Sequence, residues 1–244
     1  MIGLKNGETN LQKQYRMNKI LFIGDSFTWG QGLYFYKWME DNRELPSSVS
    51  GMYPSHAHLV TPADIKYKDE HSFTGLVSNY YGLEPVKRLT NGGGNTDIIL
   101  DMIPMIDKLG NDIDKVVFQF TSISRYQFRD LNMGNIDNRN GTFEEIYADR
   151  VSNLFEYVDN TLKYFAGLYN FKYCYLDWLG DFYKESPFKF VTYSVGGIRC
   201  NYFNQFLNEY KIDLMVDKKP IIDLHLNKEG QKVLSNAIIS HFGK

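Results

Sequence analysis

Apolar runs alternate with stretches of helical periodicity along most of the chain. The apolar runs predict strands at Lys19–Gly24, Pro85–Leu89, Lys115–Phe120 and Phe171–Asp177, with a last short strand or turn at Pro220–Ile222. Because helical segments separate these runs, we expect parallel strands that are joined by crossover helices. The pattern therefore predicts an α/β protein with a central parallel sheet of about five strands.

Segments with apolar residues at helical spacing predict the helices. They are Ser72–Tyr81, Thr96–Leu109, Phe143–Tyr169, Asn201–Lys211 and Lys228–Phe242. Ser72 has the side chain of a helix cap, and Gly82 is placed to end the same helix. The stretch Leu33–Glu70 lacks such a pattern. We expect a long irregular insertion there, of the kind that often forms a lid or a binding loop.

Composition and charge narrow the function classes. The chain has 244 residues, a formal net charge of −2 and no long cluster of Lys or Arg, which argues against nucleic acid as a partner. No apolar run approaches the ~18 residues of a membrane span. The polar segment 1–16 lacks the apolar centre of a signal peptide. We expect an N-terminal extension over 1–16 and a single domain over 17–244, located in the cytoplasm, or in a virion if a phage encodes it.

The first predicted strand ends in Gly24-Asp-Ser-Phe-Thr-Trp-Gly30, and this segment carries the candidate chemistry. Ligands of parallel α/β sheets bind beyond the carboxyl ends of the strands, where Ser26 falls. A serine becomes a nucleophile when an imidazole takes its proton, an acid orients that imidazole and donors stabilise the oxyanion. Asp223-Leu-His225 supplies an acid and a base, and the order Ser, Asp, His occurs in known triads. We expect Asp25 and Thr28 to hold the turn through bonds from side chain to backbone.

These residues also carry a family resemblance. GDSFTWG resembles the first sequence block of the SGNH (GDSL-type) hydrolases, usually GDSxTxG, and DLHLNKEG at 223–230 resembles their last block. The resemblance runs from Lys19 to the C-terminus. It implies a three-layer flavodoxin-like fold and a serine esterase that needs no cofactor. Ser26 would be the nucleophile, His225 the base and Asp223 its orienting acid.

The middle blocks of the family are less well matched. NGGGNTD at 91–97 resembles the second block, in which Gly92 or Gly94 would donate its backbone N–H to the oxyanion and Asn95 would be the polar partner. The third block, Gly-x-Asn-Asp in the family, is replaced by Phe-Thr-Ser-Ile-Ser-Arg at 120–125. Asn95, Ser122 or Arg125 would then complete the oxyanion hole beside the N–H of Ser26. This departure suggests a divergent branch.

We interpret other conspicuous residues as structural. His56 and His58 have the spacing of a metal pair, but no third ligand is evident and we predict no metal. The aromatic run Tyr34–Trp38 is read as core of the insertion, with a glycan-stacking wall as the alternative. We expect hydrolysis of short-acyl esters, with carbohydrate O-acetyl groups favoured, so that the partner is a small-molecule or glycan ester. The alternatives are an acyltransferase or lipid esterase, and a non-catalytic binding or virion structural protein.

Overall fold

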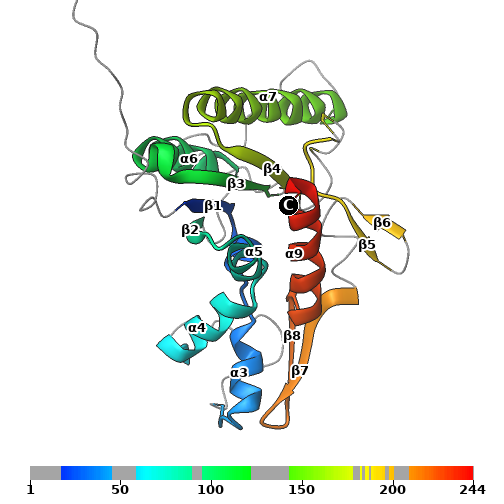
Figure 1. The fold of residues 1–244 in the computed structure, drawn as a ribbon. Helices are drawn as coiled ribbons and strands as arrows, with labels where there is room; N and C mark the ends of the chain where they lie inside the picture. Colours follow the sequence, from blue (N-terminus) through cyan, green and yellow to red (C-terminus); the bar gives the residue numbers. More distant parts are fainter. Residues whose placement is uncertain are drawn as a thin grey trace, which may run out of the picture.

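A parallel sheet of four strands forms the centre of the molecule (Figure 1). The computed structural model describes residues 18–45, 59–89, 95–121, 143–177, 182, 185–186, 188–195, 198–200 and 209–243. The strands are β1 (Lys19–Gly24), β2 (Glu84–Leu89), β3 (Ile113–Phe120) and β4 (Lys172–Asp177). All three pairings are parallel in the order β2-β1-β3-β4, which is the flavodoxin-like order. The predicted α/β class is confirmed, with four central strands in place of about five.

Strand β1 shows why the apolar runs predict strands so well. Its side chains from Ile20 to Ile23 are all fully buried. Ile20 and Phe22 belong to one core cluster, whereas Leu21 and Ile23 belong to another. Successive side chains point to opposite faces of a sheet, so a strand that is covered on both faces is apolar at every position.

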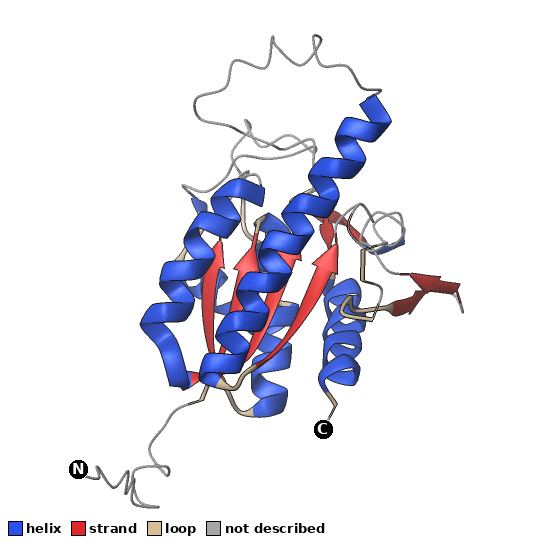
Figure 2. Cartoon of the chain, turned by 90° about the horizontal axis from the view of Figure 1, so that it is seen from above, coloured by secondary structure: helices blue, strands red, loops and turns tan. Residues whose placement is uncertain are grey.

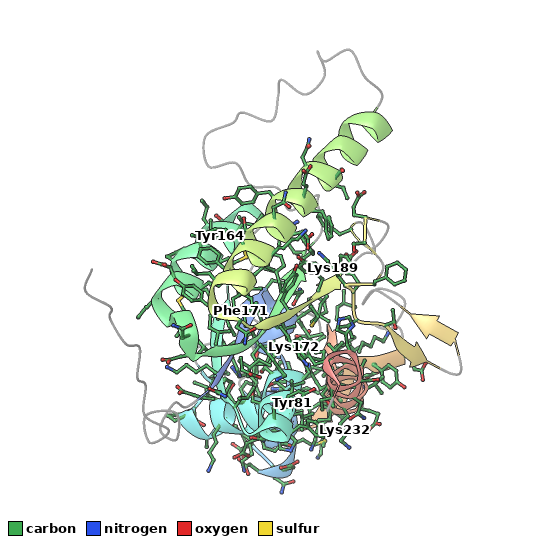
Figure 3. All side chains as sticks on the ribbon, turned by 45° about the horizontal axis from the view of Figure 1, so that its top comes forward. Tyr81, Tyr164, Phe171, Lys172, Lys189 and Lys232 are labelled. Carbon is green, nitrogen blue, oxygen red and sulfur yellow. The ribbon has the colours of Figure 1, made fainter. Side chains whose placement is uncertain are left out.

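Helices cover both faces and complete three layers. Helices α5 (Phe73–Tyr81) and α9 (Lys228–Phe242) contribute to the first core cluster, and α6 (Asn95–Leu109) and α7 (Phe143–Tyr169) to the second. Figure 2 shows α6 and α7 over one face of the central sheet. The hydroxyl of Tyr81 donates to the carbonyl of Gly243 at 2.8 Å and ties α5 to the end of α9 (Figure 3).

The insertion after β1 is more regular than expected. Two helices lie in its described part, α3 (Tyr34–Glu40) and α4 (Pro62–His71), so the prediction of an irregular segment is wrong there. A capping box starts α4, in which the Thr61 side chain bonds the backbone of Asp64 and the Asp64 side chain bonds the backbone of Thr61. Helix α4 is polar, so it lacks the apolar period that identifies the other helices.

A hairpin lies outside the central sheet. Strands β7 (Lys211–Val216) and β8 (Lys219–Leu226) are antiparallel, and Figure 1 shows them beside α3. Asp217 and Lys218 join them with φ of 47° and 58°, the left-handed pair of a tight hairpin turn. The predicted last strand at 220–222 therefore belongs to this hairpin. Lys211 begins a strand instead of ending a helix, and 201–208 lie outside the described residues.

The remaining elements are short. A 3-10 turn, η2 (Gly110–Asp112), follows α6, and strands β5 (Tyr193–Val195) and β6 (Ile198–Cys200) form a second antiparallel pair. Within the described ranges, no helix combines the length and apolar character that crossing a membrane requires.

Candidate active site

Ser26 lies where β1 gives way to the short helix α2 (Ser26–Trp29), at the carboxyl end of the strand. Asp25 is the cap of this helix, and its carboxylate accepts the backbone N–H of Phe27 at 3.0 Å. Gly30 ends the helix with a left-handed φ of 74°. Ser26 is nearly buried by these neighbours, with 6% of its surface exposed.

The acid and the base come from strand β8. Asp223 and His225 are two positions apart on this strand, so their side chains point to the same side of it. The Asp223 carboxylate accepts the backbone N–H of His225 at 2.8 Å and also contacts Nδ1 of the imidazole. One carboxylate thus holds both the backbone and the ring of His225, although only one residue separates the two in sequence.

The imidazole of His225 contacts Ser26, which lies near the other end of the sequence. Nε2 of His225 lies 2.8 Å from Oγ of Ser26, across 199 positions in sequence. A carboxylate offers acceptors only, so Nδ1 carries the proton that faces Asp223, and the lone pair of Nε2 faces the serine hydroxyl. This tautomer is the one that removes a proton from serine.

Aromatic rings enclose the base and the acid. The Phe27 ring lies against the His225 ring, with 4.7 Å between centroids. Tyr34 is also buried, and its pKa is raised above the ordinary tyrosine value, first by burial and then by the negative charge of Asp223. Its hydroxyl therefore stays protonated beside the carboxylate. The aromatic run at 34–38 is partly core, as the sequence predicts, and it also forms the surroundings of the acid.

Gly32 allows a close approach between the insertion and the acid. Its φ is +85°, and a Cβ at this position would lie 2.5 Å from Cδ1 of Ile212 and 3.4 Å from Cγ of Asp223. Any other residue would meet both the steric contact and the unfavourable backbone conformation. The segment after α2 therefore packs directly on the hairpin that carries Asp223, a contact that sequence reasoning missed.

The predicted oxyanion residues are only partly described. Asn95 is fully buried at the start of α6. Its Nδ2 donates to the Thr121 carbonyl, and its Oδ1 accepts the Thr121 N–H, both at 2.9 Å. Asn95 therefore fastens α6 to the residue that follows β3. The other predicted members lie outside the described residues, and these are Gly92, Gly94, Ser122 and Arg125. His56 and His58, for which we predict no metal, also lie outside them.

Sequence reasoning also missed Gln119. This residue lies in the apolar strand β3 and is fully buried. Its side chain contacts both Asp25 and Thr28, so Thr28 bonds a side chain and not the backbone, in contrast to the prediction. A lone amide within the run Lys-Val-Val-Phe-Gln-Phe is the signal that could have identified it, because a buried polar group needs a partner.

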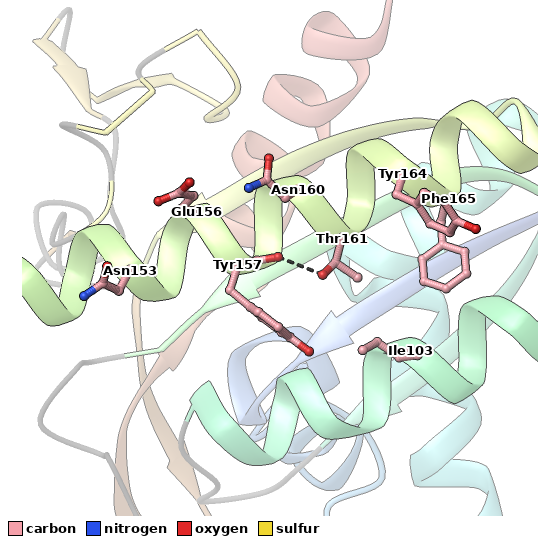
Figure 4. Close-up of a pocket in the computed structure, with 8 residues that line it drawn as sticks. All are labelled: Ile103, Asn153, Glu156, Tyr157, Asn160, Thr161, Tyr164 and Phe165. Carbon is pink, nitrogen blue, oxygen red and sulfur yellow. Dashed lines mark hydrogen bonds between the residues drawn. The ribbon is translucent and has the colours of Figure 1, made fainter.

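A hollow of about 610 Å³ lies elsewhere, between α6 and α7 (Figure 4). Ile103 lines it from α6. The lining residues from α7 are Asn153, Glu156, Tyr157, Asn160, Thr161, Tyr164 and Phe165. Neither Ser26 nor His225 lines this hollow. The candidate active site is therefore identified by the contacts among Ser26, His225 and Asp223, and not by a cavity.

Comparisons with known proteins return structures only. No family model and no curated protein matches the sequence. One similar structure is a carbohydrate esterase whose active site displays divergent catalytic and non-catalytic binding functions, at 16% identity and a TM-score of 0.45, over 93% of this chain and 65% of that one. Another is a carbohydrate esterase family 2 enzyme with a carbohydrate-binding domain from Corynascus thermopiles (Myceliophthora fergusii), at 15% identity and a TM-score of 0.38, over 93% and 67%. Likeness at this level says nothing about the chemistry of the Ser26 site.

Proposed function

We propose that this protein is a serine esterase that hydrolyses carboxylic esters through an acyl-enzyme on Ser26. The observation that carries the proposal is the continuous contact from Oγ of Ser26 to Nε2 of His225, at 2.8 Å, and from Nδ1 of His225 to Asp223. All three side chains are nearly buried, which keeps their mutual orientation fixed. A nucleophile, a base and an orienting acid in one line are the parts that acyl transfer requires.

The reaction follows from this arrangement. Oγ of Ser26 attacks the ester carbonyl while its proton passes to Nε2, and Asp223 stabilises the imidazolium that forms. The imidazolium then donates the proton to the departing alcohol, which leaves the acyl group on Ser26. A water molecule enters, gives a proton to Nε2 and attacks the acyl carbon. The carboxylic acid then leaves and Ser26 regains its proton.

The sequence blocks support the same class of enzyme. GDSFTWG carries Ser26 and DLHLNKEG carries Asp223 and His225, and these are the segments that resemble the SGNH hydrolases. They lie in contact although they come from opposite ends of the chain. This agreement between resemblance and geometry supports placing the protein with these esterases.

We further propose a short acyl group as the part of the substrate that Ser26 receives, with an O-acetylated carbohydrate as the favoured ester. The support is helix α4 of the insertion, in which the ammonium of Lys68 lies 4.0 Å from the centroid of the Trp29 ring of α2. Most residues of α4 are polar or charged, whereas a long acyl chain would need apolar surface.

The test is labelling by a fluorophosphonate, which captures a serine whose base and oxyanion donors are already arranged. We expect the probe to modify Ser26 alone, as identified by mass spectrometry of peptides. Both Ser26→Ala and His225→Ala should abolish labelling while the fold, followed by circular dichroism, survives. A folded, unmutated protein that resists the probe would exclude the esterase.

A second candidate function is binding without catalysis on the same scaffold. The observation that favours it concerns Asn95. Its Nδ2 donates to the Thr121 carbonyl and its Oδ1 accepts the Thr121 N–H, both at 2.9 Å. A side chain that is committed to this role contributes less to an oxyanion. If the probe fails while the folded protein binds acetylated oligosaccharides in calorimetry, the binding function replaces the esterase.

A further inference from the structure

The turn that carries Ser26 is held from the neighbouring strand. In the pairing of β1 with β3, Ile23 is opposite Phe118, so Gln119 is level with the point at which β1 ends. Gln119 is fully buried, and so are Asp25 and Thr28. The side chain of Gln119 therefore meets the turn inside the protein, away from water.

Both ends of the Gln119 amide are used. Its Nε2 donates to Oδ1 of Asp25 at 2.6 Å, and its Oε1 accepts the hydroxyl of Thr28. A carboxylate is an acceptor only, which fixes the direction in which the amide lies. The same Oδ1 accepts the backbone N–H of Phe27. One side chain thus fastens the turn on both sides of the Ser26-Phe27 pair.

Gly24 makes room for this network. A Cβ at Gly24 would lie 2.3 Å from Oγ1 of Thr28 and 2.9 Å from Cβ of Gln119. Both distances are shorter than van der Waals contact permits, so a side chain here would push the two partners apart. Glycine is therefore required at position 24, the first of the GDSFTWG segment, by the close approach of Thr28 and Gln119.

We propose that Gln119 is a positioning residue that fixes Oγ of Ser26 opposite Nε2 of His225. This inference rests on the proposed esterase function. Gln119 acts through Asp25 and Thr28, and the serine between them is placed by the turn that they define. Because a buried network that is hydrogen-bonded through both ends of the amide holds its members in place, the hydroxyl of Ser26 is held where His225 can take its proton. A displacement of about 1 Å at such a site costs about 10²-fold in rate.

The principal experiment compares Gln119→Leu with the unmutated protein. With a short-chain nitrophenyl ester, kcat should fall by about 10²-fold while KM changes little, because the loss concerns the nucleophile and not substrate binding. Fluorophosphonate labelling of Ser26 should slow by a similar factor. Ser78→Ala is the control, since it removes a buried hydrogen bond of 2.7 Å within α5 and should leave kcat unchanged.

Gln119→Glu gives a readout that a space-filling role would not move. A protonated glutamic acid can donate to Asp25 as the amide does, whereas its carboxylate repels Asp25. The rate of this variant relative to the unmutated protein should therefore rise as the pH is lowered from about 8 to about 6. A ratio that is constant with pH would contradict the proposal.

If Gln119→Leu fails to fold, Thr28→Val provides a milder test because it removes only one hydroxyl of the network. Its kcat should fall by about tenfold. Where Gln119→Leu does fold, adding Thr28→Val to it should cause little further loss, as expected of partners in one network. A folded variant of either kind that keeps the full kcat overturns the inference.

The inference and the proposed function fail in different ways. An unmutated protein without hydrolysis or labelling would refute the esterase and leave the geometry of the turn to be measured directly. Crystal structures then decide, because Gln119→Leu should move Oγ of Ser26 beyond hydrogen-bond distance of Nε2 of His225. An unchanged 2.8 Å contact in the variant would overturn the positioning role.

Discussion

At the scale of single residues, His225 determines what the site can do. Its two nitrogens have different partners, with Nδ1 toward Asp223 and Nε2 toward Ser26. Asp223 is 2% exposed and also bonds the backbone N–H of His225, so the ring has little freedom to turn. The tautomer of the imidazole is therefore the property on which catalysis depends most directly.

Asp223→Asn tests this dependence. An amide can donate to Nδ1 and thereby favour the wrong tautomer, in which Nε2 carries a proton and cannot accept another. We expect kcat for a short-chain nitrophenyl ester to fall by about 10⁴-fold with the fold retained, the size of effect known for this change in a serine protease. Asp213→Asn is the control, since Asp213 is an exposed residue of the same hairpin. A loss below about tenfold would remove Asp223 from the proposed mechanism.

At the scale of elements, helix α3 and the β7–β8 hairpin form one packed unit. A third core cluster contains Tyr34, Phe35 and Trp38 from α3 together with Ile212, Val216 and Ile221 from the hairpin. The hairpin does not pair with the central sheet, although Leu226 at the end of β8 packs in the first core cluster with residues of β1. We expect its contact with α3 to help place Asp223 and His225 relative to Ser26.

Trp38→Ala should loosen this unit. Trp38 is fully buried, and truncating such a side chain costs about 3–5 kcal/mol of stability. We expect a lower melting temperature and, in the fraction that is folded, a lower kcat. Phe155→Ala is the matched control because Phe155 lies in the cluster on the other face of the sheet, so it should lose stability without losing kcat. Equal kcat values for the two variants would show that α3 does not position the hairpin.

Helix α4 contains a buried cation. Lys68 is 2% exposed, its ammonium lies 4.0 Å from the centroid of the Trp29 ring, and Asp69 is its ion-pair partner at 3.2 Å. Burial lowers the pKa of Lys68 to about 8, with Asp69 opposing the shift and Lys87 adding to it. The folded state therefore releases this proton more readily than the unfolded chain. Its charged form weakens the fold below about pH 8, and that penalty disappears as the pH rises toward the unfolded pKa.

Lys68→Met tests whether the buried charge of Lys68 destabilises the folded state. The variant should melt a few degrees above the unmutated protein at pH 7, and the difference should shrink as the pH rises from about 8 to about 10. Differential scanning calorimetry at several pH values measures it. Lys66→Met, at a side chain that is 79% exposed, should show no such trend. A variant that is less stable than the unmutated protein at pH 7 would mean that the contacts with Trp29 and Asp69 outweigh the burial of the charge.

At the scale of the whole molecule, the site lies where two differently built parts meet. The central sheet supplies Ser26 at the carboxyl end of β1, and the hairpin supplies Asp223 and His225 from outside that sheet. The insertion between β1 and β2 packs against the hairpin through α3 and carries the polar helix α4. The surroundings of the site therefore belong largely to the insertion.

Substrate preference should reflect these surroundings. Among nitrophenyl esters, we expect kcat/KM to be highest for acetate and to fall as the acyl chain lengthens to octanoate, because the polar helix α4 offers little apolar surface to a long chain. The comparison of kcat/KM across the series measures it. A preference for octanoate would favour a lipid esterase over the proposed short-acyl enzyme.

The sequence by itself determined the central layers. Strands that are buried on both faces are continuously apolar, so β1 was predicted with its observed bounds, and α7 and α9 were too because their apolar residues recur at helical spacing. It also singled out Ser26, Asp223 and His225, whose catalytic roles stay predictions. The signals for strands and helices are local, because buried positions recur along each element with the period of that element.

The tertiary structure alone decided how distant segments meet. In the folded protein, β8 lies outside the central sheet, His225 contacts Ser26 and Gln119 contacts the turn after β1. The periodic pattern of apolar residues within one element does not predict such contacts. Helix α4 was missed because it is polar, although Thr61, Pro62 and Asp64 carry the signal of its start. A contact between residues far apart in sequence depends on the packing of every element between them, and only the folded chain fixes that packing.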